Sequence, residues 1–369
     1  MIGTTGKRGH HPDYFFLAVV IVLTVFGLAM LASASSNLGK TNFNDTYYYL
    51  KHQILYGLSL GVLGFAVGYF FRYQNLKRVA FILLLISLAL LVLVFTPLGS
   101  DVRNTSRWLK FGPFSFQPAE LMKLTFIIYL AAWLANPKFK RATDFQSGLL
   151  PFLIISGIIA GLLIFQPATS TVVILLLSGL MVYFVSGAPF KYIALIALCA
   201  VTAIGLVIYF TPYRRARITG FLDQSGDAQG KNYQVNQALI AIGSGGWTGV
   251  GYGQSVTKNG YLPTPIDDSI FAVVAEELGF VGAGALIAFF AMFTFRLFWL
   301  AKRTGDRFGR LLLVGFGTLV AFQALVNMGA ISGLIPLTGV PLPFVSYGGT
   351  ALAVFLTISG ISLNVSRYT

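Results

Sequence analysis

Ten apolar runs, each close to the length of a membrane-spanning helix, recur along this chain of 369 residues. A helix needs about 20 apolar residues to cross the hydrocarbon core of a bilayer. Only 10% of the residues are charged, whereas soluble domains carry roughly a quarter, so the chain has too little polar surface for a soluble globule. We therefore predict an all-α polytopic membrane protein that forms a single domain over residues 1–369, with about ten transmembrane helices at 14–34, 54–71, 78–97, 118–135, 148–165, 170–187, 190–211, 270–300, 311–335 and 344–365.

Basic residues in the short connections predict which end of the bundle faces the cytoplasm. Short cytoplasmic loops of membrane proteins are enriched in Lys and Arg. Both termini fall on the same side as the basic connections, so both are predicted to be cytoplasmic. The basic positions lie at 72–78, 137–141, 191 and 302–310, together with Lys7, Arg8 and Arg367.

Three connections of interest then lie on the non-cytoplasmic side, at residues 37–49, 98–117 and 211–269. The last of these, between the seventh and eighth spans, is the longest, and a loop of this length seldom lacks structure of its own. Between residues 232 and 242 its apolar side chains recur at helical spacing. This pattern predicts an amphipathic helix at the membrane interface.

Two charged residues fall at the start of the fourth predicted span. Glu120 and Lys123 are three residues apart, so they share one face of a helix and can neutralise each other. An ion pair that makes the helix insertable is one interpretation. A polar cavity that binds substrate is the other, because charges within the membrane usually line functional sites.

Two carboxylates, Asp267 and Asp268, precede the eighth span. An Asp at this position often caps the first amides of a helix. The alternative is a general base at the outer membrane surface, where a neighbouring carboxylate and the helix terminus have opposite effects on the pKa. The sequence leaves both interpretations open.

Basic residues also occur on the predicted non-cytoplasmic side, which is normally depleted in them. Arg103, Arg107 and Lys110 lie in one loop, and Arg214, Arg215 and Arg217 lie in another. Guanidinium groups bind phosphate oxygens in a bidentate fork, so this distribution predicts a phosphate or pyrophosphate ligand, with anionic lipid headgroups as the alternative. Nucleic acid is not an expected partner.

Ser255 and Lys258 have the S-x-x-K spacing of penicillin-recognising serine enzymes. The partner motifs of those enzymes are absent, so the spacing is better explained by chance. Lys258 remains a candidate for substrate binding, as does Ser346.

The segment Asn327 to Gly349, NMGAISGLIPLTGVPLPFVSYGG, resembles the signature of the SEDS family, the FtsW, RodA and SpoVE proteins of bacterial cell-wall synthesis. The resemblance extends to four further segments, so with the ten spans it covers nearly the whole chain. These segments are Ser106 to Gly112, Phe116 to Lys123, Ala241 to Gly246 and Ile270 to Gly279.

The resemblance implies a peptidoglycan glycosyltransferase that polymerises lipid II and releases undecaprenyl pyrophosphate. It implies a multi-pass protein of the cell inner (cytoplasmic) membrane that acts with a class B penicillin-binding protein and with other divisome or elongasome membrane proteins. No cofactor is implied with certainty. The one candidate is a divalent cation, Mg²⁺ or Mn²⁺, since hard oxygen ligands suit such ions.

The family pattern carries over to specific residues of this chain. The essential aspartate corresponds to Asp268 and not to Asp267, and the family's Glu, Lys and Arg correspond to Glu120, Lys123 and Arg107. Asp268 would be the general base. Arg107, with Lys123 and Arg103, would hold the pyrophosphate.

This chain also departs from the family pattern. Ile266-Asp-Asp-Ser269 stands where the family usually has His-Thr-Asp-Phe, and Ala168 stands where it usually has Asp. The segment from Gly251 to Lys258 looks more like the FtsW branch, which implies septal wall synthesis. The alternatives are a RodA-type elongation polymerase, a lipid II flippase, or a scaffold that recruits the crosslinking enzyme.

Overall fold

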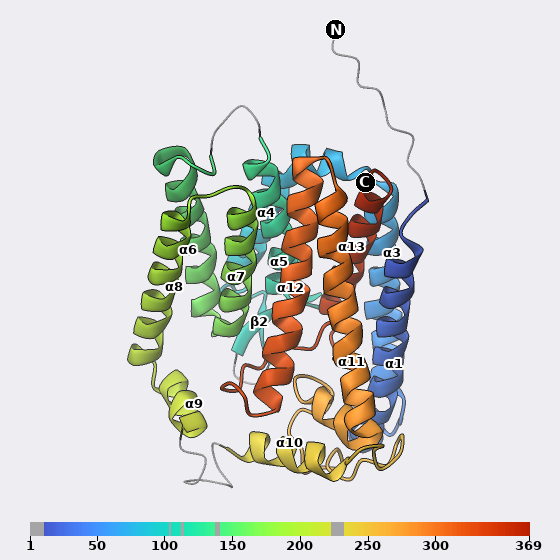
Figure 1. The fold of residues 1–369 in the computed structure, drawn as a ribbon. Coiled ribbons are helices and arrows are strands. Elements are labelled where there is room, and N and C mark those ends of the chain that lie inside the picture. Colours follow the sequence, from blue (N-terminus) through green and yellow to red (C-terminus); the bar gives the residue numbers. More distant parts are fainter. Residues whose placement is uncertain (1–10, 103–104, 112–113, 137–140, 223–231) are drawn as a thin grey trace.

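The computed structural model describes residues 11–102, 105–111, 114–136, 141–222 and 232–369 as a long helical bundle with a small sheet (Figure 1). Each of the ten predicted apolar runs contains a helix of this bundle. The elements are α1 Tyr14–Phe43, α2 Tyr48–His52 continued by the π-helical η1 Gln53–Leu58 and by α3 Ser59–Phe70, α4 Tyr73–Leu93, β1 Gly99–Val102, β2 Thr105–Phe111, β3 Phe114–Phe116, α5 Pro118–Leu134, η2 Phe145–Leu149 continued by α6 Leu150–Phe165, α7 Thr169–Val185, α8 Phe190–Phe210, α9 Pro212–Leu222, α10 Tyr233–Ser244, α11 Ile270–Arg303, α12 Arg307–Ile331 and α13 Gly349–Ser366.

The membrane-spanning character of the chain is confirmed. Among the described residues, eight helices are long and apolar enough to cross a bilayer. The other two helices in predicted spans are shorter, because α5 and α7 have 17 residues each. α7 is apolar, whereas α5 carries Glu120 and Lys123 on buried positions.

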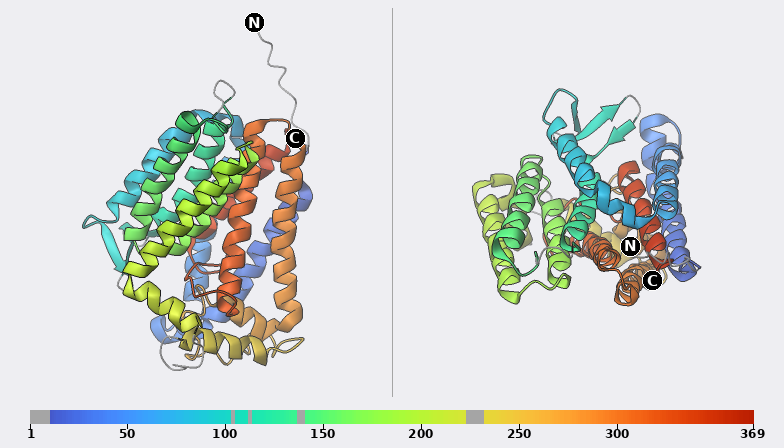
Figure 2. Two further views of the ribbon diagram at one scale, coloured as in Figure 1. Left: turned by 60° about the vertical axis from the view of Figure 1, so that its left-hand side comes forward. Right: turned by 90° about the horizontal axis from the view of Figure 1, so that it is seen from above.

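The two ends of the bundle differ in what they carry. α1 begins and α13 ends at one end, while α9 and α10 lie at the opposite end (Figures 1 and 2). α1 therefore begins at the end of the bundle where α13 ends, and α9 and α10 lie away from both points. The assignment of these sides to cytoplasm and exterior stays a prediction.

Acidic residues define the starts of three helices at the end where the termini lie. The side chains of Asp13, Asp144 and Asp306 precede α1, η2 and α12 and accept hydrogen bonds from backbone amides of the first turn. Such N-caps satisfy amides that have no partner within the helix. The sparse carboxylates of this chain are therefore used in part to begin helices.

The end opposite the termini contains structure that the apolar pattern predicts only in part. The amphipathic helix predicted at 232–242 is confirmed as α10. The helix α9 was not predicted, and neither was the three-stranded antiparallel sheet in the order β1-β2-β3. Arg107 therefore lies on β2, a strand of this sheet, and not in an irregular loop.

Burial separates central helices from peripheral ones. In α12 and α13, 78% of the most apolar stretch is buried inside the protein, whereas in α8 only 6% is buried. α8 lies at the periphery of the bundle (Figure 2), so most of its surface is available to lipid. α12 and α13 flank the signature segment, which is thus held by the most rigidly packed part of the molecule.

α11 is interrupted near its N-terminal end by Gly279, which has φ 65° and ψ −165°. A Cβ at this position would lie 2.3 Å from the amide nitrogen of Gly249, so only glycine allows the loop after α10 to approach this closely. That loop supplies partners for the backbone groups that the interruption frees. The amides of Phe280 and Val281 donate to Gly246 and Trp247, and the carbonyls of Glu276 and Glu277 accept from Val250 and Gly251.

Close packing of α3 against α13 depends on residues without side chains. A Cβ at Gly360 would lie 2.2 Å from the carbonyl oxygen of Phe65, so α13 touches the backbone of α3 at this point. Small residues commonly permit such close contacts between membrane helices, where dispersion replaces the hydrophobic effect as the main attraction.

We therefore predict that Gly360→Ala lowers the free energy of unfolding by about 1 to 3 kcal/mol, the usual cost of overpacking. Gly157 in α6 is the matched control, because a Cβ there meets no atom within 4 Å. Thermal unfolding of the detergent-purified variants checks the prediction. Equal melting temperatures for Gly360→Ala and Gly157→Ala would contradict it.

Candidate active site

Asp268 lies on a short turn immediately before α11, and two other segments clamp this turn in place. The amide of Asn327 on α12 donates to the carbonyl oxygens of both Asp268 and Val340, each at 2.8 Å. The Ser346 hydroxyl donates to the carbonyl oxygen of Asp267, and the amide of Tyr347 donates to that of Ile266 at 2.8 Å. The α12–α13 connection, residues 332–348, thus holds the backbone that carries Asp268.

The Asp268 carboxylate bonds polar side chains rather than helix amides. Thr264 donates its hydroxyl to Oδ1, and Nε2 of Gln234 on α10 lies 3.3 Å from Oδ2. Ser269 occupies the N-cap position of α11. The capping interpretation is therefore not supported for Asp268, whose carboxylate is half-buried at the surface of the turn.

A cavity of about 310 Å³ opens beside this turn. Its wall includes Gly339, and a Cβ placed there would lie 3.9 Å from Oδ2 of Asp268. Asp268 is therefore next to the cavity edge. Ile204 and Ile208 of the peripheral helix α8 form part of the apolar wall, so one side of the cavity adjoins the lipid-facing surface.

Three guanidinium groups line the same cavity, Arg107 from β2 and Arg214 and Arg217 from α9. Within the described residues, none of the three forms an ion pair. Their bonds go to neutral acceptors: Nε of Arg107 lies 2.7 Å from the Gln166 carbonyl oxygen, and Nη1 of Arg217 lies 3.0 Å from that of Leu337.

The arginine cluster is electrostatically unbalanced. Burial lowers the pKa of Arg107, the positive charges of Arg217 and Arg214 lower it further, and Tyr213 opposes the effect. Guanidinium stays protonated despite such shifts, so the cost of burying like charges persists until an anion binds. The cavity is built to accept negative charge.

Glu120 and Lys123 form a buried ion pair inside the bundle. Nζ of Lys123 lies 2.7 Å from both carboxylate oxygens of Glu120 and 2.7 Å from Oε1 of Gln323. Gln323 in turn donates to the carbonyl oxygen of Pro341 at 2.9 Å. Through Gln323 the pair is thus linked to the α12–α13 connection, which agrees with the ion-pair interpretation.

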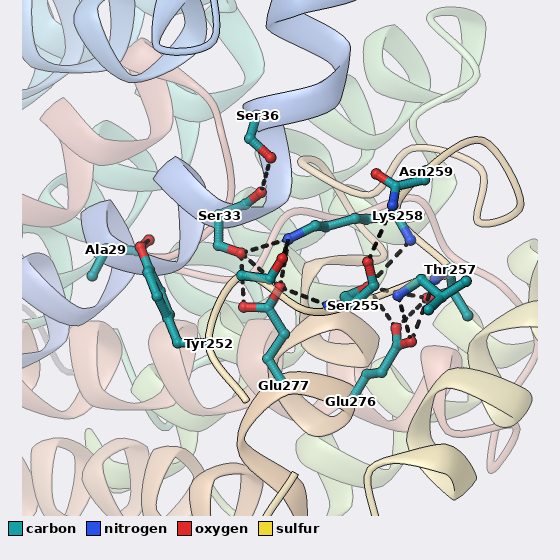
Figure 3. Close-up of polar contacts among 12 residues, drawn as sticks. Ala29, Ser33, Ser36, Tyr252, Ser255, Thr257, Lys258, Asn259, Glu276 and Glu277 are labelled. Carbon is teal, nitrogen blue, oxygen red and sulfur yellow. Dashed lines mark hydrogen bonds and ion pairs between the residues drawn. The ribbon is translucent and has the colours of Figure 1, made fainter. Parts of the chain in front are cut away.

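Lys258 is also committed to internal bonds, in a network around Glu276 and Glu277 (Figure 3). Its Nζ lies 2.7 Å from Oε1 of Glu277, 2.9 Å from the Ser33 hydroxyl and 2.8 Å from the Gly253 carbonyl oxygen. These acceptors use all three ammonium protons. Lys258 therefore fastens the loop after α10 to α1 and α11, with no donor left for a substrate.

The remaining predictions for the site concern Ser346, Arg103 and a divalent cation. Ser346 is buried and uses its hydroxyl on Asp267 and on the amide of Leu342. Arg103 lies outside the described residues. No group of three or more His, Cys, Asp or Glu within the described ranges could hold a metal ion, so the Mg²⁺ or Mn²⁺ candidate stays a prediction.

Comparison with known proteins decides the family. A family model described as "Cell cycle protein", that of FtsW, RodA and SpoVE, matches residues 13–369. This chain belongs to that family.

Named relatives and solved structures agree with the match. The chain is 36% identical to stage V sporulation protein E of Bacillus subtilis over 99% of both chains. It is 39% identical to a probable peptidoglycan glycosyltransferase FtsW of Thioalkalivibrio sulfidiphilus, over 95% of this chain and 88% of the relative.

Among solved structures, one chain comes from a study of how a peptidoglycan synthase complex coordinates polymerisation and crosslinking. It matches with a TM-score of 0.77 and 30% identity, over 96% of this chain and 98% of the other. Crystalline RodA of Thermus thermophilus matches with a TM-score of 0.71 and 28% identity, over 96% and 97%.

Two polar residues of the site, Gln234 and Thr264, were not predicted from the sequence. Gln234 and Thr264 contact the Asp268 carboxylate, yet neither is charged. The one available signal for Gln234 was its place on a predicted amphipathic helix. Ala168, which stands where the family usually has Asp, lines the arginine cavity, so this family member lacks a carboxylate there.

We predict that Lys258→Met destabilises the protein by about 3 to 5 kcal/mol, because it leaves Glu277 buried without a counter-charge. Adding Glu277→Gln should restore part of the loss. The control is Lys51→Met, which removes an ion pair whose lysine side chain is 68% exposed and should leave stability unchanged. Thermal unfolding in detergent checks both variants, and equal melting temperatures would contradict the assignment.

Proposed function

We propose that this chain is a peptidoglycan glycosyltransferase of the inner membrane that polymerises lipid II and releases undecaprenyl pyrophosphate. The observation that carries the proposal is the position of a carboxylate, Asp268, next to the edge of a cavity lined by three arginines that form no ion pair with any described residue. The names of the curated relatives support the same activity.

The reaction needs the two kinds of group that the site brings together. A hydroxyl of the acceptor sugar must lose a proton as it attacks the anomeric carbon of the donor, and the C–O bond to the lipid pyrophosphate must break. Asp268 accepts the proton as general base, a role worth roughly 10²- to 10⁴-fold in rate. The arginines stabilise the negative charge that develops on the departing pyrophosphate.

The position of the cavity suits a lipid-linked substrate. Arg107, Arg214 and Arg217 would hold the pyrophosphate, while the apolar wall from α8 faces the route by which the prenyl chain reaches the bilayer. Little of α8 is buried by the other helices. The prenyl chain of the substrate can therefore remain in lipid while its headgroup enters the cavity.

The biological setting follows from the relatives. We propose septal wall synthesis with a class B penicillin-binding protein and other divisome proteins, because most of the similar curated proteins are named FtsW. A RodA-type role in elongation is the alternative within the family. A flippase gains less support, since Glu120 and Lys123 neutralise each other and Lys123 also bonds Gln323.

The first prediction concerns the base. Asp268→Asn should reduce polymerisation by at least about 10²-fold, because an amide cannot accept the proton at neutral pH. Polymerisation of labelled lipid II by the purified protein with a class B partner, resolved on gels, measures the effect. Asp267→Asn is the matched control and should keep most of the activity; near-normal synthesis by Asp268→Asn would remove the base assignment.

The second prediction concerns the pyrophosphate. Arg217→Gln and Arg107→Gln should each raise the KM for lipid II by about tenfold, the usual effect of losing one charge-assisted contact. Arg215→Gln is the control, because Arg215 lies on the same helix but is exposed and does not line the cavity. Equal KM values for Arg215→Gln and Arg217→Gln would exclude the cavity as the pyrophosphate site.

A further inference from the structure

The environment of the Asp268 carboxylate is made by uncharged residues from two separate segments. Gln234 belongs to α10, and Thr264 lies four residues before the carboxylate it contacts. No Lys or Arg of the described residues forms an ion pair with Asp268. The orientation of this carboxylate therefore depends on neutral hydrogen-bond donors.

Gln234 reaches the carboxylate from α10. Its Nε2 lies 3.3 Å from Oδ2 of Asp268, 3.0 Å from the Ser269 hydroxyl and 3.3 Å from the Thr264 hydroxyl. An ionised carboxylate only accepts hydrogen bonds, so the amide must present its NH₂ group to Asp268. A single side chain thus connects the interfacial helix with the turn before α11.

Thr264 holds the other carboxylate oxygen and adopts an unfavourable backbone conformation to do so. Its hydroxyl donates to Oδ1 of Asp268, while its φ of 48° lies in the left-handed region. This region is a genuine outlier for a β-branched residue and costs of order 1 kcal/mol or more. Glycine would relieve that strain but would supply no hydroxyl.

The Thr264 backbone closes the same turn. Its carbonyl oxygen accepts hydrogen bonds from the amides of Asp267 at 3.1 Å and of Ser269 at 3.4 Å. Backbone and side chain of one strained residue therefore both face Asp268. This is the arrangement expected where strain is retained because it orients a reacting group.

The departure from the family pattern gives these contacts their importance. Ile266 stands where the family usually has His, and an isoleucine offers neither donor nor acceptor to Asp268. We infer that Gln234 and Thr264 are positioning residues that orient the Asp268 carboxylate for proton abstraction, one at each oxygen. The inference rests on the proposed function, because it assigns them to the same base.

The contacts also leave the Asp268 carboxylate able to accept a proton. Each carboxylate oxygen has two lone-pair sites, and the described donors occupy one on each oxygen. A site therefore remains for the hydroxyl proton of the acceptor sugar. Donors that fix a base without saturating it favour reaction through orientation.

The test compares four variants with wild type in the lipid II polymerisation assay. Gln234→Leu and Thr264→Val keep side-chain volume and remove the donors; each should lower kcat about 10- to 100-fold, the effect of losing a hydrogen bond to a charged group. KM for lipid II should stay within about twofold, because neither residue contacts the arginine cluster. Thr264→Ser keeps the hydroxyl and should recover most of the rate.

Gln237→Leu is the matched control on α10, one turn further along. Its side chain makes no hydrogen bond among the described residues, so kcat should be unchanged. The amount of folded protein, measured by size-exclusion chromatography, gives a second readout. A purely structural defect would lower this amount and leave kcat per folded molecule unchanged.

The outcomes separate the two claims. Wild type that forms no glycan with a bound partner would overturn the proposed function and, with it, this inference. Active wild type together with full kcat in Gln234→Leu and Thr264→Val, or an equal loss in Gln237→Leu, would overturn the inference alone. Loss of kcat per folded molecule with an unchanged KM, together with recovery in Thr264→Ser, would establish it.

Discussion

The cost of an unpaired polar group in hydrocarbon governs how charge is used throughout this protein. Within the bundle, Lys123 pairs with Glu120, and at its outer end Lys258 pairs with Glu277. Removal from water costs several kcal/mol per ion, which only close partners offset. Against this background, the three half-buried arginines of the cavity, which pair with no carboxylate in the described ranges, support our proposal that the site binds an anion.

The same constraint explains how far the fold could be predicted. Apolar runs specify membrane helices because every backbone group must be bonded within its own segment there. Outside the membrane this rule lapses, so the sheet around β2 and the helix α9 left no comparable pattern. The interruption at Gly279 was hidden within an apolar run, since the loop that satisfies its backbone groups comes from a distant part of the sequence.

The site was predictable where charge or family pattern marked a residue, and not where packing chose the partner. Arg107 lines the cavity and Asp268 lies next to its edge, both at positions that the family pattern singled out. Lys258 was chosen for its charge, yet its charge serves Glu277, because only the folded chain brings Ser33 and Glu277 to it. Gln234 and Thr264 are polar residues of ordinary appearance, and their role depends on a turn that no local pattern predicts.

The helices α9 and α10 each contribute side chains to the candidate site. α9 supplies Arg214 and Arg217 to the arginine cavity, and α10 supplies Gln234 to the Asp268 carboxylate. Both helices lie at the end of the bundle opposite the termini, where α10 contacts α11 and α12. The two departures from the family pattern lie at these same two positions. Ala168 replaces a carboxylate in the arginine cavity, and Ile266 replaces an imidazole two residues before Asp268. In this chain, neutral donors, Gln234 and Thr264, are thus the groups that bond the Asp268 carboxylate.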